Sequence, residues 1–170
     1  MRGFLALAAL LQRYVEMRKV RTIAFAVLVL LLICFIWGQS MMPRAVSARE
    51  SSFLMRLLKP LLDPNNHISS KVFHHYLRKA AHFTEYAALG FCMSGFLLCF
   101  NWRREQMRIP TAVLACLLIA AADESIQLVS VDRGAQLRDV VLDFCGALFG
   151  LAVFLFLACL LRKRRQKEAT

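Results

Sequence analysis

The chain has 170 residues, of which 59% are hydrophobic, and it carries a formal net charge of +11. A soluble domain of this length does not need so much apolar residue to build a core, so the surplus is expected to face lipid. The basic residues flank the apolar runs, and no nucleic-acid-binding motif accompanies them, so nucleic acid is excluded as the expected partner. Composition therefore predicts an all-α membrane protein with membrane lipids as its surroundings.

Taken in chain order, the first predicted element is an interfacial amphipathic helix at residues 1–21, which holds apolar side chains at helical spacing but too few to span. Four longer runs approach the roughly 20 residues that a hydrocarbon layer of about 30 Å requires. The predicted spans are residues 22–38, 80–100, 110–129 and 139–161. A second amphipathic helix is predicted inside the loop at residues 39–79, and residues 162–170 form a basic tail.

The distribution of Lys and Arg predicts the orientation of these spans. Basic residues are dense in the N-terminal segment, in the short loop between the second and third spans, and in the tail, whereas those of the loop 39–79 are spread out. Dense basic residues next to spans stay in the cytoplasm, so both termini are predicted to be cytoplasmic. The dense groups are Arg2, Arg13, Arg18, Lys19 and Arg21; Arg103, Arg104 and Arg108; and Arg162, Lys163, Arg164, Arg165 and Lys167.

Ionisable residues interrupt the last three predicted spans, all near one leaflet. Glu85 and Asp123 are expected roughly 10 Å below the outer surface and Asp143 roughly 6 Å below it. Each charge within the membrane costs about 2.5 kcal/mol or more, so these groups are expected to face one another or a water-filled cavity. The residues that share these positions are Arg78, Lys79, His82, Glu85, Tyr86, Asp123, Glu124, Gln127, Asp139 and Asp143. They predict a polar site near the extracytoplasmic leaflet.

The same residues suggest roles in binding or processing an amphiphile. The catalytic candidates are His82, Glu85, Asp123 and Glu124, with His82 or Glu85 as general base. Basic side chains would hold a phosphate or carboxylate, and further polar side chains would orient them. The binding candidates are Arg78, Lys79, Tyr86, Gln127, Arg133, Asp139 and Asp143. The sequence leaves open whether the protein is an enzyme.

Other interpretations fit the same pattern. His82 with Glu85 and Asp123 would suit a divalent metal ion such as Mn²⁺, Mg²⁺ or Zn²⁺. A transporter or proton-coupled carrier could use the charges as a relay, although they do not continue into the inner halves of the spans. A non-catalytic scaffold would use them as ion pairs that fix helix register. Gly146 and Gly150 form a small-residue stripe that allows close backbone approach, which suggests a homo-oligomer.

Three blocks of this sequence, taken in order, resemble the VanZ-like family of bacterial membrane proteins between Thr22 and Leu161. The blocks are Arg78-Lys79-x-x-His82-Phe83-x-Glu85-Tyr86-x-x-Leu89-Gly90, then Asp123-Glu124-x-x-Gln127 followed by Arg133, then Asp139-Val140-x-x-Asp143-x-x-Gly146-x-x-x-Gly150. The resemblance implies a small multi-span protein of the bacterial cytoplasmic (inner) membrane. The founding member of the family is associated with low-level teicoplanin resistance. The resemblance therefore also implies a cell-envelope substrate and an effect on glycopeptide susceptibility. Family members often carry serines at the outer end of the first span, where Ser40 is the counterpart in this chain.

Overall fold

The computed structural model describes residues 2–42, 52, 55–100, 105–129 and 136–168. Its elements are α1 (Arg2–Met41), a short helix at residues 55–62, α3 (Ser70–Cys99), a 3-10 turn (Glu105–Met107), α4 (Arg108–Val129) and α5 (Leu137–Glu168). No strand occurs in these described ranges, which confirms the predicted all-α class.

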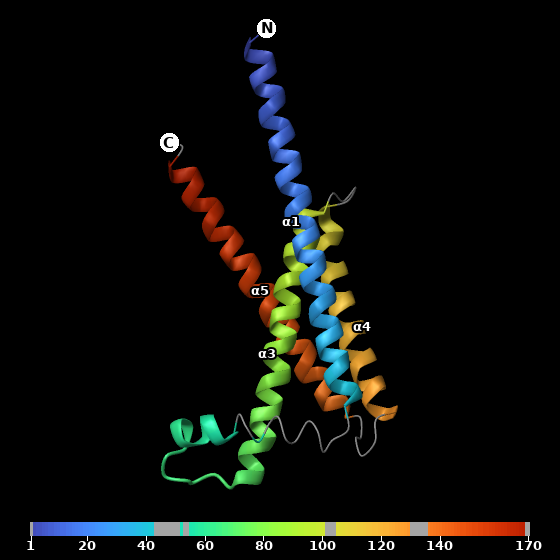
Figure 1. The fold of residues 1–170 in the computed structure, drawn as a ribbon, viewed down its shortest axis with the longest axis vertical. Helices are drawn as coiled ribbons and strands as arrows, with labels where there is room; N and C mark the ends of the chain where they lie inside the picture. The colour runs from blue at the N-terminus through green and yellow to red at the C-terminus, as the bar shows by residue number, and fades with distance from the viewer. Residues whose placement is uncertain (1, 43–51, 53–54, 101–104, 130–135, 169–170) are drawn as a thin grey trace.

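The four long helices form an up-and-down bundle in which α3 lies in contact with α1, α4 and α5 (Figure 1). Successive helices run in opposite directions, so both chain termini lie at the same end of the bundle. The short helix at residues 55–62 lies across the bundle axis at the opposite end. Helices α1 and α5 diverge toward the termini, where each extends beyond the packed part of the bundle.

The helix bounds differ from the predicted spans mainly at their N-terminal ends. Helix α1 runs without interruption from Arg2 to Met41, so the N-terminal segment and the first predicted span belong to one helix. Helix α3 begins at Ser70, so residues 70–79 of the predicted loop belong to the same helix as the span predicted at residues 80–100. Periodicity does not mark these ends, because the flanking residues are themselves good helix formers. Contact of residues 2–14 with a membrane surface stays a prediction.

Three helical segments are long and apolar enough to cross a membrane: Val15–Met41, Glu105–Val129 and Leu137–Arg164, among the described residues. They correspond to the first, third and fourth predicted spans. Helix α3 is not among them, because polar residues such as His82 and Glu85 lower the hydropathy of its first half. Composition and length thus support a membrane protein with three such helices.

The outside of the bundle is apolar, and its largely apolar interior also holds buried carboxylates. Large apolar side chains cover the outside: Leu31, Leu118 and Phe156 are 61%, 59% and 62% exposed. The interior holds Asp123 and Asp143, which are 0% and 2% exposed. An apolar exterior is stable against lipid tails, whereas buried carboxylates require polar neighbours.

Glycines allow α3 and α5 to pack with their backbones close together. A Cβ added at Gly146 would lie 2.5 Å from the Phe83 carbonyl oxygen of α3. A Cβ at Gly150 would lie still closer to the Ala87 carbonyl oxygen, and one at Gly90 would collide with the backbone of Ala147. The close approach predicted for the glycine stripe therefore takes place between two helices of one chain. The expected homo-oligomer stays a prediction, and it would have to use another face.

A side chain fixes the turn that leads into α3. The Asp63 carboxylate follows the short helix 55–62, and it accepts hydrogen bonds from the backbone N–H groups of His67 (2.8 Å) and Ile68 (2.9 Å). The bond from Ile68 is the main cause that lowers the pKa of this carboxyl below its usual 3.8, against a smaller opposing effect of burial.

At the other end of the bundle, the side chain of Arg18 in α1 caps the C-terminal end of α3. Its Nε donates to the Cys99 carbonyl oxygen at 2.9 Å and its terminal nitrogen to that of Phe100 at 3.3 Å. The last carbonyls of a helix lack partners within the helix, so this cation satisfies two of them and opposes the negative end of the helix dipole.

Candidate functional site

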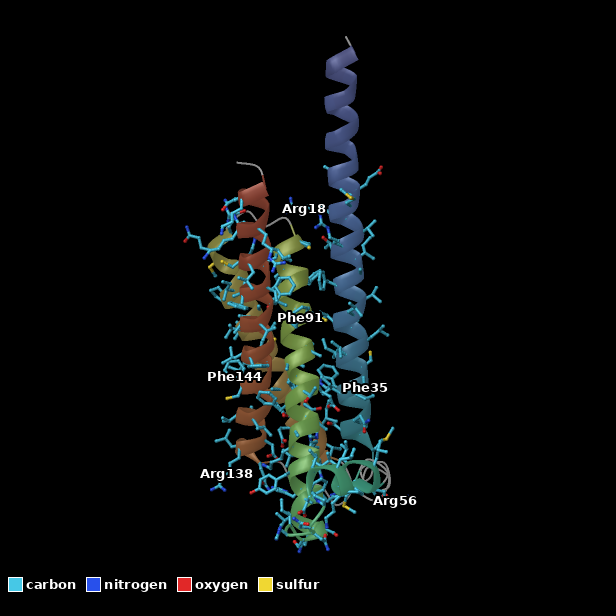
Figure 2. All side chains as sticks on the ribbon, turned by 90° about the vertical axis from the view of Figure 1, so that its left-hand side faces the viewer. Arg18, Phe35, Arg56, Phe91, Arg138 and Phe144 are labelled. Carbon is cyan, nitrogen blue, oxygen red and sulfur yellow. The ribbon has the colours of Figure 1, made fainter. Side chains whose placement is uncertain are left out.

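The predicted site residues gather at the end of the bundle opposite the termini. This group, called the polar cluster below, combines side chains from the first half of α3, the second half of α4 and the start of α5. Two of its members, Asp139 and Asp143, belong to the stretch of α5 between Arg138 and Phe144, which are both labelled in Figure 2. The polar cluster comprises Arg78, Lys79, His82, Glu85, Tyr86, Asp123, Glu124, Gln127, Asp139 and Asp143, together with Ser40 at the end of α1.

Helix geometry explains why these residues meet. On α3, His82 and Glu85 are three residues apart, and on α5, Asp139 and Asp143 are four apart, so each pair lies on one helix face. Because α3 and α5 run parallel to each other and antiparallel to α4, the N-terminal halves of α3 and α5 meet the C-terminal half of α4. The carboxylates therefore converge at one level of the bundle.

The interior of the polar cluster is closed to solvent and hydrogen bonded across helices. Gln127 Nε2 donates to Asp123 Oδ2 (3.2 Å) on the same helix and to Ser40 Oγ (3.3 Å) on α1. All three residues are buried. The amide of Gln127 thereby links α1 to α4 and orients the Asp123 carboxylate.

His82 and Glu85 place an imidazole and a carboxylate side by side, an arrangement that a general base can use. His82 Nδ1 lies 3.8 Å from Glu85 Oε2, and both side chains are about one-fifth exposed. This separation is longer than a hydrogen bond but short enough for one rotamer change to close it. The pair could accept or relay a proton from a bound molecule.

The rim of the polar cluster is more open than its interior. Lys79 Nζ of α3 lies 2.7 Å from Asp139 Oδ1 of α5, and each side chain is 30% exposed. Glu124 is buried nearby, where its Oε2 accepts a hydrogen bond from the Gln136 backbone N–H at 3.1 Å and its charge interacts favourably with that of Arg78. The cationic groups thus lie at the edge of an acidic interior.

The Tyr86 hydroxyl and Asp143 Oδ1 are buried polar atoms of the cluster without a hydrogen-bond partner within the described ranges. The Tyr86 hydroxyl interacts electrostatically with four carboxylates, those of Glu85, Asp123, Glu124 and Asp143. It is therefore directed into the acidic interior. Buried polar atoms are normally satisfied, so both atoms point to a ligand or water.

Three side chains of the cluster lie close enough together that they could hold a metal ion. His82, Asp123 and Asp143 each offer one ligand atom, and these atoms lie within 4.8 Å of one another. The sequence predicted Glu85 in place of Asp143 in such a set. The structure brings Asp143 of α5 to His82 and Asp123, because α5 packs closely against α3, and a metal-binding role of Glu85 stays a prediction.

One predicted site residue falls outside the described part of the chain, and one residue of the polar cluster was missing from the predicted site. Arg133 lies outside the described residues. Ser40 was noted only as the counterpart of a family serine, although it is completely buried and accepts the hydrogen bond from Gln127. No periodicity in α1 marks Ser40, since it is an isolated polar residue at the end of an apolar run; only contact with α4 shows that it belongs to the cluster.

These features define a class of protein: an α-helical chain with a lipid-compatible exterior and a buried ionisable cluster at one end of its bundle. The chain belongs to the VanZ-like family, since the family model described as VanZ/LLP1 matches residues 25–159, most of the chain. The match includes every described residue of the polar cluster and confirms the predicted resemblance. Comparisons with curated proteins and with solved structures give no match.

Proposed function

We propose that this chain crosses the bacterial cytoplasmic membrane four times and uses the polar cluster to bind an anionic amphiphile of the cell envelope at the extracytoplasmic leaflet. The proposal takes α3 as the fourth span. Between Leu77 and Cys99, α3 has no large apolar side chain in the exposed class, because the other helices surround it. A span enclosed by protein does not need a uniformly apolar surface.

The distribution of charge supports the orientation. Basic residues of α1 and α5 lie at the end of the bundle that carries both termini, including Arg18, Lys19 and the group Arg162–Arg164. The positive-inside rule assigns this end to the cytoplasm. The polar cluster then lies in the extracytoplasmic half of the membrane, where lipid headgroups join their acyl chains.

The function rests on one observation: an acidic interior that is buried among apolar helices and bordered by cations at a partly open rim. Lys79, 30% exposed, and Arg78 provide positive charge where an amphiphile's phosphate or carboxylate would enter. Exposed apolar side chains such as Val141 lie beside the rim and could contact the tails. A water-soluble ligand would not need this apolar border.

Processing of the bound amphiphile would use the His82–Glu85 pair. In a binding protein these residues only position the ligand, whereas in an enzyme one of them accepts a proton during reaction. The expected signature of an enzyme is a change in the chemical composition of the lipid pool. The signature of a binding protein is co-purification of an unchanged lipid.

The test compares bacteria that carry the wild-type chain with bacteria that carry Glu85→Gln or Asp123→Asn, with Glu105→Gln as the matched control. Glu105 is an exposed acid at the opposite end of the bundle. Mass spectrometry of whole-cell lipids and of lipids that co-purify with each protein should distinguish wild type and control from the two cluster variants. Teicoplanin susceptibility, measured in the same strains, should likewise differ between the two cluster variants on one side and wild type and control on the other.

The proposal is wrong if all four proteins are folded and equally abundant, yet the lipid pools and the co-purifying lipids are identical. The proposal would also be contradicted if the lipids of the Glu105→Gln strain differed from those of wild type as much as the lipids of the two cluster variants do, because the effect would then not depend on the polar cluster.

A further inference from the structure

The donor set at the centre of the polar cluster is suited to a cation. His82 of α3, Asp123 of α4 and Asp143 of α5 present ligand atoms within 4.8 Å of one another. Donors bound to one metal ion at about 2.1 Å lie about 3–4 Å apart. Small rotamer adjustments on three packed helices would therefore bring the three atoms into a single coordination sphere.

Buried polar atoms independently point to a ligand at this place. The Tyr86 residue is 0% exposed and its hydroxyl, which lacks a hydrogen-bond partner within the described part of the chain, interacts with the Asp123 and Asp143 carboxylates. Asp143 Oδ1 is buried and likewise without a hydrogen-bond partner there. Oxygen atoms in such a position are usually satisfied by a ligand, an ion or water.

The charge of the cluster's interior, away from the cations of its rim, favours a cation there over an anion or a neutral ligand. Asp143 interacts repulsively with Asp123, Glu124, Asp139 and Glu85. Lys79 forms its ion pair with Asp139 at the rim, where both side chains are 30% exposed, and not with Asp143 in the interior. Repulsion between carboxylates in a low-dielectric bundle is strong, and a divalent cation between them would convert it into attraction.

We infer that His82, Asp123 and Asp143 bind a divalent cation of the first transition row. One imidazole with two carboxylates suits Mn²⁺, Fe²⁺ or Zn²⁺, whereas Mg²⁺ and Ca²⁺ prefer oxygen ligands alone. Gln127, which donates a hydrogen bond to Asp123 Oδ2, orients one ligand. Outer contacts of this kind hold metal ligands in place.

This site goes beyond the proposed amphiphile binding and is tested without any amphiphile. The full chain is purified in detergent, treated with EDTA, incubated with Mn²⁺, Zn²⁺ or Mg²⁺, and desalted before elemental analysis. The variants are His82→Asn and Asp143→Asn. The matched control is His75→Asn, since His75 is an exposed histidine of the same helix, outside the cluster.

Wild type and His75→Asn should each retain about one Mn²⁺ or Zn²⁺ per chain, and both cluster variants should bind at least tenfold more weakly. Loss of the free Mn²⁺ electron paramagnetic resonance signal at one equivalent gives the same answer for wild type alone, so an unfolded variant does not prevent the test. The inference would be overturned if wild type held no stoichiometric metal. It would also be overturned if His75→Asn and Asp143→Asn bound metal equally, or if the protein bound Mg²⁺ alone. Failure of lipid binding in the preceding experiment leaves this result unaffected.

Discussion

The glycine contact between α3 and α5 gives a graded prediction for helix packing. In Gly146→Ala the new Cβ would lie 2.5 Å from the Phe83 carbonyl oxygen, whereas ordinary contacts begin at 3.4 Å. The helices would have to part by roughly 0.9 Å, because a backbone carbonyl cannot rotate away as a side chain can. Overpacking of this kind costs about 1–3 kcal/mol. Gly150→Ala is expected to cost more, since its Cβ would lie closer still to the Ala87 carbonyl.

The matched control is Gly38→Ala, because an added Cβ at Gly38 of α1 meets nothing within 4 Å. This variant should gain about 0.5–1 kcal/mol from the higher helix propensity of alanine. The same gain offsets part of the cost at the other two glycines, so the order of stability should be Gly38→Ala, wild type, Gly146→Ala and Gly150→Ala.

The assay is the free energy of unfolding in lipid bicelles, measured by steric trapping or by titration with a denaturing detergent. Equal stability of Gly38→Ala and Gly150→Ala would refute the argument, since it would mean that α3 and α5 are not held at the separation described above. Gly146→Ala and Gly150→Ala together should cost less than the sum of the two, because one separation of the helices relieves both contacts.

Three further predictions concern the ends of the bundle. The carboxylate of Asp63 has a lowered pKa in the folded protein, so its contribution to stability is complete above the unfolded pKa of 3.8. This contribution is lost as the pH falls through the lower pKa of the folded protein. Asp63→Asn should therefore remove the acid dependence of hydrogen exchange at the turn before α3. Arg18→Ala should destabilise the protein by about 1–2 kcal/mol through the uncapped end of α3, and Lys19→Ala, at an exposed neighbouring position, should change stability little in the same unfolding assay. A double-mutant cycle on Lys79 and Asp139 should give a coupling below about 1 kcal/mol, because both are 30% exposed; a much larger coupling would contradict the partly open rim.

The long apolar runs made most of the fold predictable. The runs within α1, α4 and α5 correspond to the segments that are apolar enough to cross a membrane. Hydropathy is informative for these helices because each presents a broad face to the lipid. It is less informative for α3, whose neighbours are protein on most sides, and here the family motif and helical periodicity were more useful than composition.

The convergence of the ionisable residues followed from periodicity and depth, but their detailed partners did not. Spacing places His82 and Glu85 on one face of α3, and antiparallel chain direction places Asp123 at the same level. The rotation of α5 about its own axis brings Asp143 to His82 and Asp123, so that one ligand atom of each lies within 4.8 Å of the others. That rotation is set by the glycine contact with α3, which is a property of the folded pair and not of either sequence segment.

The enclosure of α3 also bears on how this protein reaches its membrane. In the proposed topology, α3 is the second span to leave the ribosome, and it carries His82 and Glu85 before α4 and α5 exist to surround them. At that stage only α1 can shield these side chains from lipid, and each exposed charge would cost several kcal/mol. Stable insertion of α3 is therefore expected to wait for the last two helices, so a chain truncated before α4 should leave α3 accessible to protease or to water-soluble thiol reagents. The residues that build the site thus make assembly of the bundle cooperative.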